Sequence, residues 1–173
     1  NKKNFTDCKA RRRRRAFCMR AARVKTKLGN KNARGGRIVD IIACGSRPSR
    51  RGPASSLTGT VWQDPIIETP EPALLRAGRV RFEPGARTFW HTHPLGQTLH
   101  IISGIGHVQA WGGPIRQVRA GDTVWIPPGE KHWHGGTPDN SMEHVAMQEA
   151  KDGQHVKWLE AVTDEQYTAK TAG

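Results

Sequence analysis

The sequence predicts an all-β fold, a barrel or sandwich built from short strands. Short apolar runs recur from residue 60 onward, and Gly-rich or Pro-rich turns separate them. The chain has 173 residues, which is enough for one domain with a substantial core. A strongly basic amino-terminal segment stands apart from this pattern. We therefore expect one folded domain preceded by an extension.

The predicted strands can be placed in chain order from their turns. Residues 46–58 are rich in Pro, Ser, Arg and Gly, and we expect them to form an extended arm over the surface or a neighbouring subunit. Strands are then predicted at residues 60–62, 74–82, 98–103, 107–111, 115–119, 123–126 and 142–148. Gly104 and Gly106 are expected to turn the chain, and Gly112-Gly113 to close a hairpin. Thr163 with Gln166 forms a capping-box pattern, which predicts a short terminal helix.

A set of candidate metal ligands lies in the stretch GARTFWHTHPLGQTL. His91 and His93 are separated by one residue, so on an extended strand both imidazoles point to the same face. The Pro and Gly that follow break this strand, and the chain can then re-enter the sheet with Gln97 facing the same cavity. A distant turn rich in Gly and Pro delivers His132 as a fourth ligand. A single histidine is more often an ordinary hydrogen-bonded residue, but three at these spacings favour a metal site.

The same stretches resemble the paired motifs of the cupin family. The first family motif, G-x5-H-x-H-x3,4-E-x6-G, is matched at Gly85, His91, His93 and Gly104, with Gln97 in place of Glu. The second, G-x5-P-x-G-x2-H-x3-N, is matched at Gly121, Pro127, Gly129 and His132, with Gly136 in place of Asn. The resemblance implies a single-domain cupin, a double-stranded β-helix or jelly-roll barrel with one metal inside. We place this domain at residues 45–173 and the basic extension at residues 1–44.

A narrower resemblance covers the chain from about residue 45 to residue 167. The segments LTGTV, FEPGARTFWHTHPLGQTL, PGEKHWHG and VTDEQY resemble the bacterial manganese-dependent hydroxynitrile lyases, cupins of the (R)-mandelonitrile lyase type, which also have Gln as third ligand. This resemblance implies one divalent metal per subunit, with Mn preferred over Fe, Co, Ni or Zn. It also implies a small-molecule substrate, an aromatic cyanohydrin, and a homo-oligomer that is a dimer or a tetramer.

The ligand set itself indicates the chemistry. His91, His93, Gln97 and His132 suit a divalent first-row metal. Because Gln brings no negative charge, a divalent ion bound there keeps its full charge and acts as a Lewis acid toward an anion or a developing alkoxide.

Four further residues are candidate catalytic groups: His134, His144, Gln148 and Thr88. His134 is expected to share the inward face of His132, and His144 and Gln148 share one face of the last strand. Either histidine can take a hydroxyl proton or can orient a metal ligand, and both roles stay open. Thr88 is a candidate hydrogen-bond donor to a small anion.

The remaining aromatic and histidine residues are given structural roles. We expect the six tryptophans in the core or at a subunit interface, with Trp90 and Trp133 pointing away from the metal. Val80 and Phe82 are expected to line an apolar pocket wide enough for a phenyl ring. We interpret three histidines as structural or exposed: His100, His107 and His155.

The formal net charge of +13 comes from the amino-terminal segment. Residues 1–52 contain 18 Lys or Arg and 2 Asp or Glu, whereas the rest of the chain contains 10 and 13. We interpret residues 1–37, which include a run of five arginines, as a disordered arm. Such an arm can bind nucleic acid. No aromatic platform or reading motif accompanies it, so we prefer a solvated tail or a start site at Met19 or Val39 and expect no nucleic-acid partner.

Compartment signals favour a cytoplasmic protein. No segment approaches the roughly 20 apolar residues of a membrane span, and basic residues follow the paired arginines that resemble an export signal. Cys8, Cys18 and Cys44 all precede the predicted barrel, and their spacing matches no zinc pattern. This agrees with a reducing compartment.

Three functional hypotheses follow from the sequence. The first is a metal-dependent hydroxynitrile lyase. The second is a metal-dependent dioxygenase that uses the same ligands, whose activity would disappear without oxygen. The third is a non-catalytic metal-binding module whose basic arm contacts nucleic acid.

Overall fold

The elements of the chain are almost all strands, as predicted. The structure, a computed structural model, describes residues 39–170, so nearly all of the predicted basic extension (residues 1–44) lies outside the described residues. The described elements are β1 (Arg50–Arg51), β2 (Leu57–Thr58), β3 (Val61–Glu68), β4 (Leu75–Phe82), β5 (Arg87–Thr88), β6 (His91–Thr92), β7 (Gln97–Ala110), β8 (Arg116–Arg119), β9 (Thr123–Ile126), β10 (His132–Gly136), β11 (Met142–Glu149), β12 (Lys157–Trp158) and α1 (Asp164–Tyr167). Across residues 39–170, no helix is long and apolar enough to cross a lipid bilayer.

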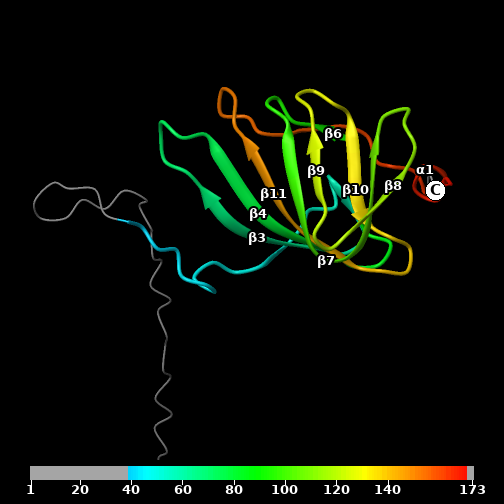
Figure 1. Cartoon of the computed structure of the whole chain (residues 1–173), viewed down its shortest axis with the longest axis horizontal. Coiled ribbons are helices and arrows are strands. Elements are labelled where there is room, and N and C mark those ends of the chain that lie inside the picture. Colours follow the sequence, from blue (N-terminus) through cyan, green and yellow to red (C-terminus); the bar gives the residue numbers. More distant parts are fainter. Residues whose placement is uncertain (1–38, 171–173) are drawn as a thin grey trace, which may run out of the picture.

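The strands form a single curled sheet around a common interior (Figure 1). Its order is β1-β3-β4-β11-β7-β10-β5-β2, and every pair in it is antiparallel. The strand β11 therefore lies between β4 and β7, which both precede it in the sequence. The apolar core fills the interior, with Phe82, Leu99, Ile101 and Met142 all nearly inaccessible to solvent.

The long strand β7 joins the two halves of this sheet, and here the predicted turn at Gly104 and Gly106 is wrong. Up to Gly104 the strand pairs with β9 and β11, and beyond Gly104 it pairs with β8 and β10. Gly104 has a φ of +77°, and a Cβ atom there would lie 2.0 Å from the carbonyl oxygen of Ser141. The glycine permits a close backbone approach where the strand changes partners, so the chain continues instead of reversing.

This difference between two glycines is testable. Gly104 and Gly112 have nearly the same φ, +77° and +75°, but a Cβ at Gly112 would meet nothing within 4 Å. Gly112→Ala is expected to lower the free energy of unfolding by about 1–2 kcal/mol, from backbone strain alone. Gly104→Ala is expected to lower it by about 2–5 kcal/mol, because the strands must also separate. Urea denaturation of both variants measures the difference, and equal losses would contradict the close-approach role.

The other strand predictions agree with the structure within a few residues at most boundaries, and one expectation needs correcting. The predicted first strand at residues 60–62 is the start of the longer β3. The arm at residues 46–58 is not purely a surface element, because it contributes β1 and β2 to the sheet and buries Leu57 in the core. The hairpin at Gly112-Gly113 joins β7 to β8 as expected.

A second apolar cluster fixes the carboxyl-terminal segment to the outside of the sheet. Trp90 and Trp133 are buried in this cluster together with Tyr167, as expected for side chains that alternate away from the metal ligands. The predicted capping box is present, since Thr163 accepts a hydrogen bond from the backbone of Gln166 and the Gln166 side chain accepts one in return. Trp133 of β10 belongs to this cluster, so the cluster anchors the strand that carries His132 and His134.

Candidate metal centre

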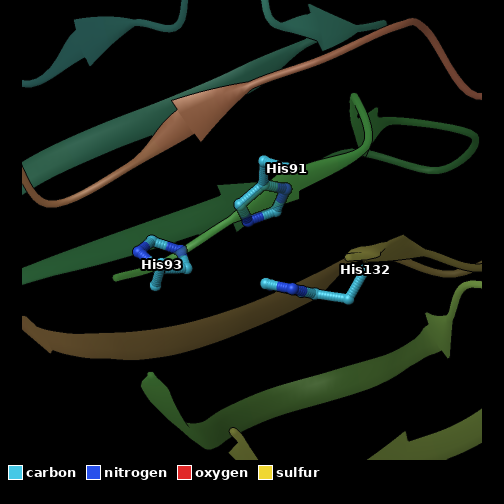
Figure 2. Close-up of side chains that lie close together, drawn as sticks. All are labelled: His91, His93 and His132. Carbon is cyan, nitrogen blue, oxygen red and sulfur yellow. The ribbon is translucent and has the colours of Figure 1, made fainter. Parts of the chain in front are cut away.

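Three histidines, from two neighbouring strands and the residue after one of them, form one buried group. His91 in β6 lies directly opposite His132 in β10, and His93 follows two residues after His91. Their candidate ligand atoms all lie within 4.8 Å of one another (Figure 2). Each of the three residues is at most 3% exposed. The predicted convergence of these side chains is therefore present in the structure.

Backbone carbonyl groups set the orientation of all three rings. The Nδ1 atoms of His91 and His132 lie 2.9 Å from the carbonyl oxygens of Phe89 and Glu130, and that of His93 contacts the carbonyl oxygen of His155. A carbonyl only accepts, so each Nδ1 carries the proton and donates. Each Nε2 therefore keeps a lone pair. In this tautomer Nε2 can bind a metal while Nδ1 donates to the carbonyl group that orients the ring.

The side chain of Gln97, the predicted third ligand, lies against the histidine group. Its Oε1 lies 3.2 Å from Nε2 of His132, and its amide Nε2 donates to Oε1 of Gln148 at 3.2 Å. Because the His132 proton is on Nδ1, the contact between Oε1 of Gln97 and Nε2 of His132 is not a hydrogen bond. It brings two lone pairs together with no hydrogen atom between them. The buried Nε2 of His93 likewise has no hydrogen-bond partner among the described residues. A cation among these atoms would satisfy all of them, so the donor set fits a metal ion.

Burial keeps these ligands neutral. Loss of solvation lowers the pKa of His93 to about 4 and that of His132 to about 4, while hydrogen bonds to carbonyl groups oppose the shift. The pKa of His91 falls well below its ordinary value, first from burial and then from the neighbouring histidines. At neutral pH the lone pairs of the group are therefore free of protons, as metal binding requires.

A second pair of histidines lies beside the first group. The Nε2 atom of His144 is 3.3 Å from Nδ1 of His134, and the Phe82 ring packs against both rings. Burial lowers the pKa of His144 to about 3 and that of His134 well below its usual range, so both are neutral. Nε2 of His134 and Nδ1 of His144 are buried without a partner among the described residues.

One cavity of about 640 Å³ brings the predicted site residues together. It is lined by seven of the eight: Thr88, His91, His93, Gln97, His134, His144 and Gln148. The eighth, His132, contacts the group through Gln97 and the ring of His91. Val80 and Phe82 also line the cavity, which is large enough for a phenyl ring.

Thr88 and Gln148 each support a neighbouring site residue. Oγ1 of Thr88 accepts a hydrogen bond of 3.1 Å from the backbone N–H of His134, which leaves the Thr88 hydroxyl hydrogen free to donate. The bond from Gln97 to Gln148 fixes the direction of the Gln97 carboxamide. The position of His134 therefore depends on Thr88, and that of the Gln97 carboxamide depends on Gln148; each supporting side chain comes from a different strand.

Sequence reasoning missed the contribution of the segment around β12. This strand pairs with β6, which places the His155 carbonyl against the His93 ring and the Trp158 ring 4.7 Å from the His91 ring. His155 is half-buried and lines the cavity, although the sequence suggested only a structural or exposed residue. No local pattern signals this role, because the carbonyl of any residue can fill it.

Comparison with known proteins identifies the family to which this chain belongs. A family model described as a cupin domain matches residues 78–147. A curated protein named (R)-mandelonitrile lyase, from Granulicella tundricola, is 54% identical over 129 residues, which cover 75% of this chain and 98% of that protein. The chain belongs to the cupin family.

Solved structures agree with this assignment. A cupin-like protein from Thermotoga maritima is 38% identical to this cupin, with a TM-score of 0.67 over 78% of this chain and 99% of that one. The polyketide cyclase RemF from Streptomyces resistomycificus is 16% identical, with a TM-score of 0.57 over 75% and 91% of the two chains. The second likeness concerns the fold alone. The predicted fold and the predicted resemblance to cupins of the mandelonitrile lyase type are confirmed.

Proposed function

We propose that this cupin is a metal-dependent hydroxynitrile lyase that cleaves and forms aromatic cyanohydrins. The observation that carries the proposal is the buried group of three histidines with free Nε2 lone pairs, next to a second histidine pair in the same cavity. The 54% identity to a protein named (R)-mandelonitrile lyase supports this reaction class.

In this proposal, His91, His93, Gln97 and His132 hold one divalent ion per subunit. Such an ion, when bound, supplies Lewis acidity that lowers the pKa of a substrate hydroxyl. Manganese is our first choice because of the lyase resemblance, and Fe, Co, Ni and Zn suit the same donors. Val80, Phe82 and Ala146 provide the apolar wall for the aromatic ring of the substrate.

The second histidine pair provides the proton acceptor. With Nδ1–H of His134 donating to Nε2 of His144, Nε2 of His134 presents a lone pair to the cavity. This atom takes the hydroxyl proton of the cyanohydrin. The O–H electron pair becomes the second bond of the carbonyl, and the carbon–carbon bond to the nitrile breaks. Cyanide leaves with the electron pair of the broken carbon–carbon bond and receives the proton back from His134, so that aldehyde and HCN are released.

Neighbouring groups hold this acceptor in place and receive the leaving group. His144 accepts from the imidazolium that His134 becomes, and so stabilises its transient charge in the buried cavity. Thr88 fixes the backbone of His134 and offers its hydroxyl hydrogen to the departing anion.

The proposal is tested by benzaldehyde release from mandelonitrile, using manganese-loaded full-length protein with and without oxygen. We expect equal rates in both conditions, because no step consumes oxygen. Activity that requires oxygen would favour the dioxygenase hypothesis instead. Absence of turnover in protein shown to contain the metal would contradict the lyase proposal.

Gln148 is expected to act on metal affinity through Gln97. Gln148→Ala removes the acceptor that fixes the Gln97 carboxamide, and loss of such a supporting hydrogen bond lowers metal affinity by about 10- to 100-fold. Gln117→Ala is the matched control, because Gln117 is exposed and bonds only to Arg119 in the described part of the chain. Competition with a fluorescent chelator measures both variants. Unchanged affinity in Gln148→Ala would show that Gln97 needs no support.

A further inference from the structure

Strand β4 carries a charged residue at the mouth of the site cavity that the proposed reaction does not use. Six residues of β4 line the cavity, and four of them alternate along one face of the strand: Phe82, Val80, Gly78 and Arg76. Phe82 is fully buried, whereas the Arg76 side chain is 28% exposed. This face of the strand therefore runs from the apolar floor of the cavity to a guanidinium group at its opening.

The sheet register places Arg76 at a fixed distance from the metal centre. Gln148 in β11 lies opposite Arg76 on one side and opposite Gln97 on the other. Two interstrand spacings separate the Cα atoms of Arg76 and Gln97 by about 10 Å. A substrate whose reacting carbon lies at the histidine group and whose opposite end reaches Arg76 therefore has to span roughly this distance, over the Gln148 side chain.

Two acidic groups near the mouth are already paired with arginines, one of them with Arg76 itself. Asp64 is held by Arg79, with 2.7 Å between Oδ2 and Nη2. Glu68 forms an ion pair with Nη1 of Arg76, and the Glu68 side chain is 65% exposed. The guanidinium has five N–H donors, and one carboxylate contact at Nη1 does not use all of them.

Two further arginines add positive charge to the same opening. Arg47 and Arg50 line the cavity, and neither has an ion-pair partner within 4.0 Å among the described residues. One Arg47 nitrogen donates to the carbonyl oxygen of Ile66. The mouth thus carries more positive than negative charge, which attracts anions toward it.

We propose that Arg76 binds a carboxylate at the end of the substrate remote from the reacting carbon. The substrate class is then a carboxylated aromatic aldehyde and its cyanohydrin, an inference that rests on the proposed lyase function for the reacting end. A guanidinium binds a carboxylate through two parallel N–H groups. Gln148 lies beside it, and its amide nitrogen, which has no partner among the described residues, supplies a further donor.

The test compares kcat/KM for mandelonitrile and for the cyanohydrin of 4-carboxybenzaldehyde. The full-length protein is expected to prefer the carboxylated substrate by about 10- to 100-fold, the range for hydrogen bonds to a charged group. Arg76→Gln should remove most of this preference, with a much smaller effect on mandelonitrile. Arg81→Gln is the matched control, because Arg81 lies on the same strand, is half-exposed and does not line the cavity.

Two results would overturn the proposal. One is an equal kcat/KM for the two substrates in the unmodified protein. The other is an equal loss of kcat/KM for both substrates in Arg76→Gln, which would indicate a structural role.

If neither cyanohydrin is turned over, the lyase proposal fails but the carboxylate site is still tested by calorimetry. Tighter binding of 4-carboxybenzaldehyde than of benzaldehyde, lost in Arg76→Gln, would support the site, and equal affinities would refute it.

Discussion

Replacing both His91 and His93 with alanine is expected to abolish mandelonitrile cleavage. These side chains supply two of the three clustered nitrogens, and the remaining donors, His132 and Gln97, cannot hold the ion alone. Lewis-acid stabilisation contributes several kcal/mol, so the rate should fall by at least about 1,000-fold. Benzaldehyde release under anaerobic conditions measures the rate, and elemental analysis of the same samples measures bound metal.

A matched histidine variant separates this effect from general damage. His100→Ala removes an exposed side chain that bonds to Thr123, away from the cavity. It should retain both metal and activity. If the double variant lost its metal but kept its activity, the metal-dependent mechanism would be wrong.

Removing the proposed base is expected to have the second-largest effect. His134→Gln keeps a side chain able to hydrogen-bond to His144 but offers no group that accepts a proton at neutral pH. The expected loss in kcat is about 100- to 10,000-fold, typical of general acid–base catalysis. Metal content should be unchanged, because the histidine ligands and their backbone partners remain.

Combining this change with a His144 variant tests whether the pair acts as a unit. If His144 works through His134, the double variant His134→Gln, His144→Gln should be little slower than His134→Gln alone. Fully multiplicative losses would mean that each histidine contacts the substrate independently. Loss of metal in His134→Gln would instead make it a structural support of the metal centre.

Local geometry explains why much of the site could be predicted from sequence. The alternation of side chains along a strand brings His91 and His93 to one face, and the break after them returns Gln97 to that face. Alternation also sends Trp90 and Trp133 to the opposite side. Each of these predictions depends on the periodicity of an extended chain, which the residues themselves determine.

The features that could not be predicted depend on contacts between distant segments. The His155 carbonyl reaches His93 only because β12 pairs with β6. Gly104 suggested a turn, yet its role is to let the backbone of Ser141 approach. Glycine serves both purposes, and only the position of the neighbouring strand distinguishes them. The homo-oligomer, the cytoplasmic location and the identity of the metal stay predictions.

The position of β11 between β4 and β7 also sets an order of assembly. Residues such as Met142 and Phe82 pair although they are 60 positions apart, and such long-range closure makes β folding slow. During synthesis, His91, His93 and His132 all emerge before His144. The nascent chain therefore contains the three histidines of the proposed metal site before the strand that completes the histidine pair has been made. An ion bound at that stage would favour the docking of β11, because binding stabilises the folded arrangement of the ligands. An ion added to the finished protein would only fill a site that has already formed.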